Sequence, residues 1–239
     1  MERLREVEPA GALVPFVPGR LWTCWRPLRF YGIAMGTRMT VCRFRSGALW
    51  VHSPVAPDEA LVAALRALGP VRWVVAPNRL HHLWLADFAR AFPDAEVHVS
   101  PGLSARRPDL RHDGVLGDAP APGWADELDQ TCVTGQRWLD EAVFLDRAAR
   151  TLILTDLCEE GHPGWPPLSR LAARLGGVWQ RHAPPRDMRF LLRRRPADTR
   201  RLVERILAWD FDRLIVAHGR LVESGAKEVI QRAFAFALA

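Results

Sequence analysis

The chain has 239 residues, of which 49% are hydrophobic and 25% charged, a composition typical of a globular protein and a length that suits one domain. No apolar run approaches the ~20 residues that a membrane-spanning helix requires, and the N-terminus lacks a secretory signal pattern. We therefore expect a cytoplasmic protein with no membrane partner. Its four cysteines are scattered without a CxxC pair, which argues against a zinc ribbon or a disulfide framework.

The formal net charge of +6 comes almost wholly from arginine. Such a charge indicates either an anionic ligand or simply an arginine-biased composition. The one tight basic run, Arg193 to Arg195, has no interleaved aromatic residues and directly precedes a helix that begins with proline. We interpret this run as solvated surface and do not expect nucleic acid as a partner.

The first third of the chain predicts two strands and a helix behind an irregular start. Residues 1–30 contain four prolines in a pattern too broken for regular elements, and we expect a covering N-terminal arm there. Residues 38–44 and 48–52 are strand-like runs separated by a short turn, which indicates a hairpin. Residues 58–68 have the apolar spacing of a helix, and Gly69 ends it.

The stretch from Val71 to Gly102 is the most informative part of the chain. Residues 71–75 predict a buried strand, because β-branched and aromatic residues dominate it. Residues 83–92 have helical apolar spacing, and residues 95–99 alternate like a strand. The adjacent pair His81-His82 therefore lies in a turn between a strand end and a helix start, where α/β folds place their chemistry.

The rest of the chain also alternates between strands and helices. Residues 103–126 are rich in glycine and proline and predict a loop, whereas residues 178–192 give no clear pattern. Strands are expected at 142–145, 151–155 and 213–217, and helices at 168–175, from Pro196 onward and at 226–239. The second of these strands ends at Asp156 and the third at His218.

Three strand ends thus carry candidate metal ligands, namely His81-His82, Asp156 and His218. Zinc and iron need imidazole and carboxylate donors that converge from separate elements, and strand ends on one rim of a sheet provide that convergence. Each of these residues also has a plainer interpretation, as a capping or turn residue.

The order of these features resembles the metallo-β-lactamase superfamily: a strand, a histidine turn, a helix, PDAEVHVSPGL, TLILTD and a late strand ending in AHG. More narrowly, PN..HH at 77–82, LW.HSP at 49–54 and TLILTD at 151–156 resemble an uncharacterised bacterial family, DUF4336. The resemblance covers residues 28–225. It implies an α/β fold, a four-layer αββα sandwich forming one domain over residues 1–239, with a metal site at the rim between the two sheets.

The superfamily's first motif, HxHxDH, is altered in this sequence. Aligned on the last histidine, His82 keeps its place and His81 replaces the aspartate, while Pro77 and Arg79 replace the two earlier histidines. The mid-chain histidine is also missing, since the matching region, residues 131–136, reads TCVTGQ. Because all the missing ligands belong to one metal site, the resemblance implies a mononuclear centre with one divalent ion, Zn²⁺ or Fe²⁺. Its ligands would be His81, His82, Asp156 and His218.

Further residues are candidates for substrate binding or for support of the ligands: Asn78, Arg79, Asp87, His52, Glu159 and His162. Asn78 is expected to bind substrate or to close the turn, and Arg79 to bind an anionic substrate or to be solvated. Asp87 is a candidate acceptor for a ligand histidine, or an exposed helix residue. His52 and His162 are spare candidates, and each is more often structural than catalytic.

These features together predict a metal-dependent hydrolase that acts on a small ester, lactone, thioester or phosphoester. Asp156, or a neighbouring carboxylate such as Glu159, would accept the proton from the attacking water. Three alternatives stay open at this point: a non-catalytic ligand-binding protein on the same fold, a nucleic-acid-binding or nuclease member, and an iron redox enzyme. Each of these is compatible with a homo-oligomer.

Overall fold

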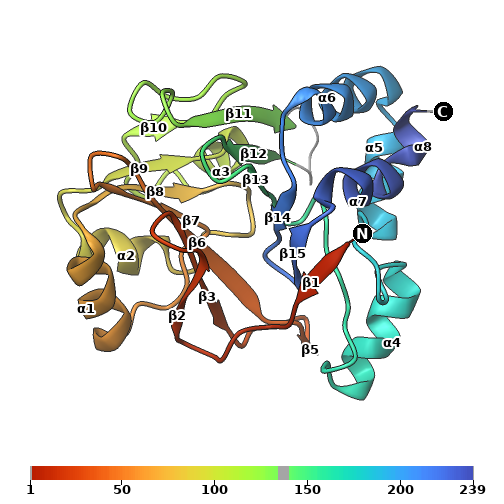
Figure 1. Ribbon diagram of the computed structural model, residues 1–239, viewed down its shortest axis with the longest axis horizontal. Coiled ribbons are helices and arrows are strands. Elements are labelled where there is room, and N and C mark those ends of the chain that lie inside the picture. Colours follow the sequence, from red (N-terminus) through yellow and green to blue (C-terminus); the bar gives the residue numbers. More distant parts are fainter. Residues whose placement is uncertain (1, 134–139, 239) are drawn as a thin grey trace.

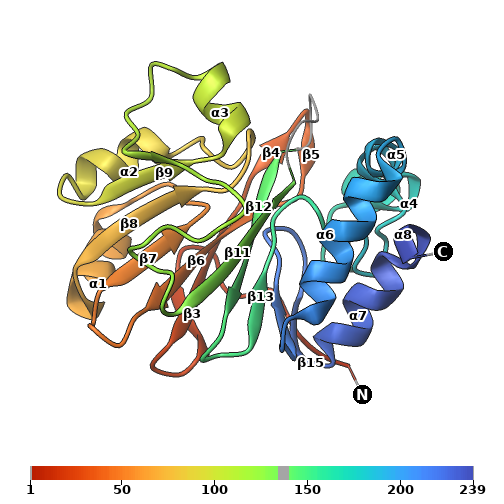
Figure 2. The ribbon, with the colours of Figure 1, turned by 90° about the horizontal axis from the view of Figure 1, so that it is seen from above.

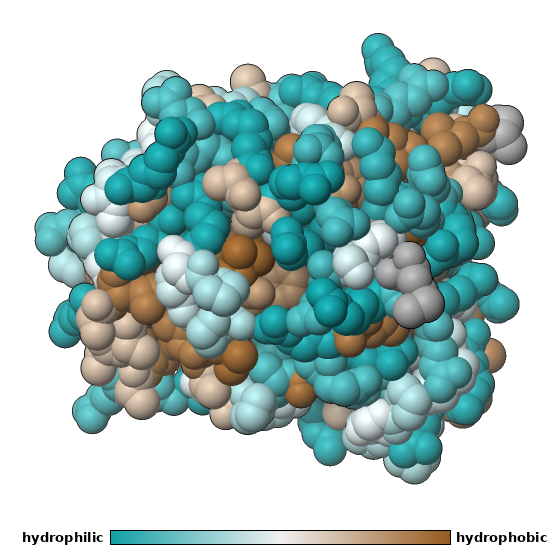
Figure 3. All heavy atoms as spheres, viewed as in Figure 1, coloured by the Kyte–Doolittle hydropathy of each residue, from teal (hydrophilic) through white to brown (hydrophobic). Residues whose placement is uncertain are grey.

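Two β-sheets face each other in the computed structural model, which describes residues 2–133 and 140–238. Helices cover the outer face of each sheet, so that four layers follow one another across the molecule (Figure 1 and Figure 2). The face presented in Figure 3 is mostly hydrophilic, and its hydrophobic residues gather toward the end of the molecule that carries helix α1 and, in a second group, at the upper right. No described helix is long and apolar enough to cross a membrane.

The first sheet has seven strands in the order β10-β9-β8-β7-β6-β3-β2. Its strands are β2 (Leu13–Val17), β3 (Leu21–Arg26), β6 (Thr37–Arg43), β7 (Leu49–His52), β8 (Val71–Ala76), β9 (Glu96–Val99) and β10 (Gly114–Val115). On this side of the molecule lie the helices α1 (Glu59–Leu68), α2 (Leu85–Ala91) and α3 (Pro101–Arg106). A separate two-stranded hairpin joins β4 (Arg29–Phe30) to β5 (Ile33–Ala34).

The second sheet has six strands in the order β1-β15-β14-β13-β12-β11. They are β1 (Arg3–Arg5), β11 (Leu128–Val133), β12 (Glu141–Asp146), β13 (Thr151–Ile153), β14 (Arg213–Ile215) and β15 (Leu221–Ser224). The helices on this side are α4 (Pro167–Gly176), α5 (Arg186–Arg193), α6 (Pro196–Ala208), α7 (Ala226–Ala233) and α8 (Ala235–Leu238).

Alternating strand residues build three separate cores, because successive side chains of a strand point to opposite faces. Trp50 of β7 packs between the sheets, with its ring centroid 4.8 Å from that of Phe144 in β12. Its neighbours Leu49 and Val51 point the other way, into the core beneath α1 and α2. On β12, Val143 likewise packs into the outer core with α6 and α7. This three-core arrangement confirms the predicted four-layer α/β sandwich.

The N-terminal segment differs from the expected covering arm. Residues 1–30 contain β1, which pairs with β15 in the second sheet, and β2 and β3, which extend the first sheet beside β6. Proline at position 15 is tolerated because β2 is an edge strand, where a missing backbone N–H breaks no inner ladder. The first 26 residues therefore belong to both sheets of the sandwich.

Most of the other expected elements lie where the sequence placed them, including the antiparallel hairpin β6–β7 and helix α1. Helix α1 begins after Asp58, whose carboxylate accepts a hydrogen bond from the Leu61 N–H. The predicted loop at 103–126 contains the end of α3 and the short strand β10. Helix α5 falls in the region that showed no clear pattern, and β11 was not expected.

Candidate metal centre

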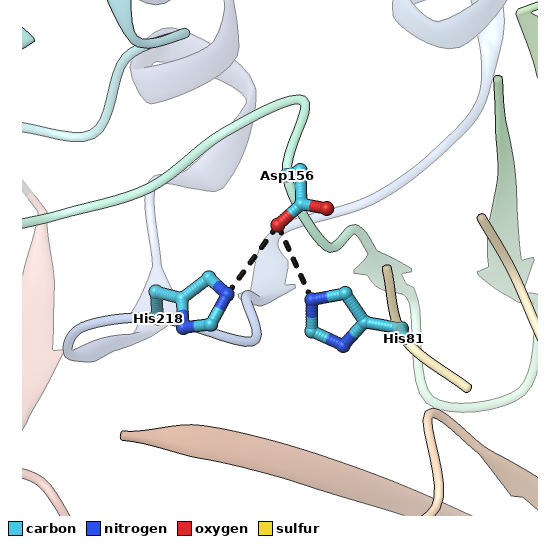
Figure 4. A group of neighbouring side chains, drawn as sticks. All are labelled: His81, Asp156 and His218. Carbon is cyan, nitrogen blue, oxygen red and sulfur yellow. Dashed lines mark hydrogen bonds and ion pairs between the residues drawn. The ribbon is translucent and has the colours of Figure 1, made fainter. Parts of the chain in front are cut away.

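Three side chains from three strand ends meet at the rim between the sheets (Figure 4). His81 follows β8, Asp156 follows β13 and His218 follows β14. The Nε2 atoms of His81 and His218 lie 3.2 and 3.3 Å from the same Oδ1 atom of Asp156. All three side chains are buried, and their candidate ligand atoms lie within 4.8 Å of one another.

The Nδ1 atom of each histidine ring also has a hydrogen-bond partner, which fixes the orientation of the ring. The Ser53 hydroxyl lies 2.6 Å from Nδ1 of His81, and the Gly36 carbonyl oxygen lies 2.7 Å from Nδ1 of His218. Because a carbonyl oxygen can only accept, Nδ1 of His218 carries a proton, and the neutral ring then has its lone pair on Nε2. Both rings are thus oriented with Nε2 toward Asp156, as metal-ligating histidines are.

Asn78 connects the two halves of the site. Its side-chain oxygen accepts hydrogen bonds from the backbone N–H groups of Leu80 and His81, which fixes the histidine turn. Its amide nitrogen donates to Oδ2 of Asp156 at 2.7 Å and to the Thr155 hydroxyl at 2.9 Å. The Asx turn expected from the sequence is therefore present, and the same side chain also positions the carboxylate.

Glu141 holds the backbone that carries Asp156. Its buried carboxylate accepts hydrogen bonds from the N–H groups of Thr155, Asp156 and Leu157 at 2.8, 2.9 and 3.0 Å. Burial and the neighbouring Asp156 carboxylate raise the pKa of Glu141 to about 7. The strand end at Asp156 is therefore fixed by an internal acceptor from the adjacent strand β12.

Arg38 fixes the turn that carries His218. Its guanidinium is buried and donates to the carbonyl oxygens of Val216 and Gly219, which flank the histidine. Glu8 neutralises it through two contacts, of 2.8 and 2.9 Å. The N-terminal segment and β6 thus determine where His218 lies.

The electrostatics of the site favour an ionised Asp156 carboxylate with positive charge beside it. Burial alone would raise the pKa of Asp156, but His81 and His218 hold it well below its usual range. Burial would lower the pKa of His81, but the Asp156 carboxylate raises it overall. Asp156 is therefore ionised at neutral pH, and positive charge is stabilised beside it.

This donor set fits a divalent metal ion. In the neutral state of His218 the Nε2 lone pair faces an ionised carboxylate oxygen at 3.3 Å, a repulsive contact unless a cation or a proton lies there. Two imidazoles and one carboxylate are ligands that zinc and Fe(II) both accept. His81, Asp156 and His218 would hold the ion.

A cavity of about 290 Å³ opens beside the three residues. Its walls are mostly apolar and come from the β4–β5 hairpin, the histidine turn, α4 and the start of α5. Glu159 and Asp187 also line it, and burial, with a further contribution from Asp156, raises the pKa of Glu159 to about 8 although His218 opposes the rise. No arginine or lysine is among the described residues of its lining.

His82, the expected fourth ligand, lies outside this group. Its ring faces the guanidinium of Arg107, with 3.4 Å between Nε2 and a guanidinium nitrogen. Burial and this guanidinium lower the pKa of His82. The tight turn gives adjacent residues different directions, so that His81 points into the rim and His82 points toward the end of α3.

The remaining candidates are distributed around the site, and only some of them face it. Glu159 lines the cavity, whereas Arg79 lies 3.8 Å from the Asp140 carboxylate. Asp87 pairs with Arg90 on the surface of α2 and does not approach either histidine.

The two spare histidines also lie outside the group of three. His52 is buried between the sheets with its ring stacked on that of Trp50. His162 contacts the ring of Trp165 in a neighbouring cavity. Residues 134–136 of the altered mid-chain motif lie outside the described residues.

Four residues that hold the ligands in place were not predicted from the sequence: Gly36, Arg38, Ser53 and Glu141. Ser53 carried a signal, because it belongs to the HSP sequence at the end of β7 and adopts a left-handed backbone with φ of 54°. The other three act across long sequence separations, where a single sequence gives no indication of contact.

A family model described as a domain of unknown function, DUF4336, matches residues 18–183. The chain belongs to this family. No match was found among curated proteins.

Several solved metallo-β-lactamases have the same fold. The enzyme from Pontibacter korlensis is 11% identical, with a TM-score of 0.62 over 100% of this chain and 99% of that one. DIM-1 is 10% identical, with a TM-score of 0.67 over 96% and 98%. FIM-1 from Pseudomonas aeruginosa, in its mono-zinc form, is 11% identical, with a TM-score of 0.62 over 97% and 98%. The DUF4336 protein therefore has the metallo-β-lactamase fold.

Proposed function

We propose that this DUF4336 protein is a metal-dependent hydrolase with one divalent ion held by His81, Asp156 and His218. The observation that carries the proposal is the convergence of two buried Nε2 atoms on Oδ1 of Asp156, with both rings oriented through Nδ1. The mono-zinc form of FIM-1 supports it, since that structure places a single ion on the same fold.

Three protein ligands suit catalysis better than four would. A tetrahedral ion with three protein ligands keeps one position open, as catalytic zinc sites do. A bound ion of this kind supplies a water molecule of lowered pKa and polarises a carbonyl group. Asn78 holds Oδ2 of Asp156, which leaves Oδ1 directed at the two imidazoles.

The cavity indicates the substrate class. Its apolar walls, and the absence of arginine and lysine among its described lining residues, favour an uncharged acyl ester, lactone or thioester over a phosphoester. We assign Glu159 the transfer of a proton to the leaving group, because it lines the cavity beside the three ligands and burial raises the pKa of its carboxyl group.

The decisive experiment measures the metal content of protein purified without a metal-affinity tag. We expect near one equivalent of zinc or iron per chain, and its loss in His81→Ala and His218→Ala. His82→Ala is the matched control, since it removes the neighbouring imidazole that faces Arg107 and should keep the metal. Circular dichroism would verify that each variant is folded.

Hydrolysis is then tested with chromogenic ester, lactone, thioester and phosphodiester substrates, before and after treatment with a chelator. We expect cleavage of an acyl substrate that is lost on chelation and restored by adding back the ion found in the native protein. A native protein that takes up no zinc, iron or manganese would refute the metal centre. A loaded protein that cleaves none of these substrates would instead favour a ligand-binding role.

A further inference from the structure

The positive charge of the molecule is concentrated in one segment. Residues 166–195 contain eight arginines and a single acidic residue, Asp187, so this segment has a formal charge of +7 in a chain whose net charge is +6. The remainder of the chain is close to neutral. The charge is therefore a local property of α4, α5 and their connection, and not a uniform arginine bias.

Most of these arginines have no acidic partner. Among the described residues, Arg195 contacts Asp198 at 3.9 Å, and no carboxylate lies within 4.0 Å of the other seven. Arg174 and Arg194 lie over the rings of Trp179 and Phe190 instead. Arg38, in contrast, is buried and paired with the Glu8 carboxylate.

The arginines of this segment also repel one another. Burial and the neighbouring Arg181 and Arg193 lower the pKa of Arg189, and its buried Nε atom has no hydrogen-bond partner. Like charges so close together are unfavourable without counter-charges. An anionic partner at this surface would relieve the repulsion.

Helix α4 adds an exposed apolar stripe beside these charges. Leu168, Leu171 and Leu175 are 59%, 51% and 64% exposed, and their spacing of three and four residues places them on one face of the helix. The adjoining face carries Ala172 and Gly176, which line the cavity. The stripe therefore borders the mouth of the cavity.

Apolar side chains are also exposed on the other elements at this mouth. Tyr31, at the tip of the β4–β5 hairpin, is 92% exposed, and Leu83 of the histidine turn, which lines the cavity, is 54% exposed. Hairpin β4–β5 lies beside helix α4 (Figure 1), and the start of α5 shares the lining of the cavity with them. We call the exposed side chains around this cavity the mouth surface; they are Tyr31, Leu83, Leu168, Leu171, Leu175, Phe190, Arg174, Arg186 and Arg194.

We propose that the mouth surface binds a bilayer that contains anionic phospholipid, so that the cavity opens toward the membrane. Exposed leucine and aromatic side chains insert at the boundary of headgroups and acyl chains, while arginines attract the anionic headgroups. This is attachment to a surface and requires no membrane-spanning helix, and it replaces the expectation that the protein has no membrane partner.

Other kinds of partner would match either the arginines or the apolar stripe, but not both. A symmetric dimer through α4 would place the same arginines opposite one another, because a two-fold interface pairs each patch with itself. Nucleic acid would pair with the arginines but would leave the leucine stripe against charged phosphates. A bilayer satisfies the charge and the apolar stripe together.

The test is co-flotation of the purified protein with vesicles of phosphatidylcholine alone or with an equal amount of phosphatidylglycerol. We expect binding only to the anionic vesicles, and weaker binding as salt is raised. Leu171→Ser with Leu175→Ser should reduce the partition coefficient at least tenfold, and Arg186→Glu about fivefold or more. Val115→Ser and Arg45→Glu are matched controls on exposed residues outside the mouth surface, and each should bind as the native protein does.

The proposal does not depend on the metal centre, and His218→Ala protein should float with the vesicles unchanged. No binding to anionic vesicles would overturn it, as would binding that the two serine substitutions leave intact. Size-exclusion chromatography of the native protein gives a separate check. A stable dimer that these substitutions dissociate would show that a second copy of the chain covers the stripe, and would also overturn the proposal.

Discussion

At the scale of single residues, the side chains of two adjacent histidines point in different directions. His81 points into the rim toward Asp156, whereas His82 points to Arg107, although both were expected to be ligands. The sequence identified the turn, Asp156 and His218 because their order along the chain follows a recognisable pattern. It could not decide which imidazole faces inward, because that direction depends on the hydrogen bonds that the Asn78 side-chain oxygen accepts from the N–H groups of Leu80 and His81.

Removing the Ser53 hydroxyl tests whether it orients the His81 ring, without changing any of the three proposed metal ligands. Ser53→Ala removes the hydroxyl that lies 2.6 Å from Nδ1, and we expect the metal to bind about 10–100-fold more weakly. Affinity is measured by competition with a chromophoric chelator. Ser53→Gly also lacks the hydroxyl but relieves the left-handed backbone, so it should bind as weakly while being about 1 kcal/mol more stable than Ser53→Ala. Equal affinity of native protein and both variants would exclude a role for the hydroxyl.

At the scale of elements, predictions succeeded where local pattern alone decides the structure. Helix α1 has a capping aspartate and a clear apolar face, and the β6–β7 hairpin has a short polar turn. They failed where distant partners decide it. Strand β1 is three residues long and exists because β15 lies beside it, and α5 combines a buried Leu192 with arginines that obscure its periodicity. Neither partner is visible in a local window of sequence.

The contact between β6 and the turn after β14 is expected to determine both stability and metal binding. Arg38→Met would leave the buried Glu8 carboxylate unpaired and release the carbonyls beside His218. We expect a loss of about 3–5 kcal/mol in the free energy of unfolding, measured in urea, together with weaker metal binding. Glu8→Gln combined with Arg38→Met should recover part of the stability.

The control for this prediction is an exposed arginine in an ion pair. Arg90→Met removes the partner of Asp87 on the surface of α2 and should change the free energy of unfolding by no more than about 0.5 kcal/mol. A similar, small effect of Arg38→Met would show that the buried pair does not hold the sandwich together.

At the scale of the whole molecule, the interior between the sheets should make stability depend on pH. His52 lies there against Trp50 and Phe144, and burial, with a smaller effect of His81, lowers its pKa to about 3. In the unfolded chain the pKa is near 6.5, so unfolding binds a proton at any pH between these values. The contribution of His52 is complete above pH 6.5 and is lost as the pH falls, by about 1.4 kcal/mol per pH unit.

His52→Phe keeps an aromatic ring between the sheets and removes the titrating group. Urea unfolding of this variant at a series of pH values should show that the free energy of unfolding falls less steeply between pH 6 and pH 4 than in the native protein. The difference in slope should correspond to about one proton bound on unfolding. Phe88→Leu, a packing change in the core beneath α1 and α2 that removes no titrating group, is the control; it should lower the stability at every pH and leave the slope near that of the native protein. An unchanged slope in His52→Phe would mean that other groups cause the acid sensitivity.

The pairing of β1 with β15 joins the two ends of the chain, since Arg5 contacts Glu223 across 218 positions. During synthesis on the ribosome, β2, β3, β6 and β7 can pair with one another early, because all four precede residue 53. The second sheet has to wait for β14 and β15, and so does the turn that carries His218. A nascent chain therefore brings His81, Asp156 and His218 together only when almost all of the described residues have emerged.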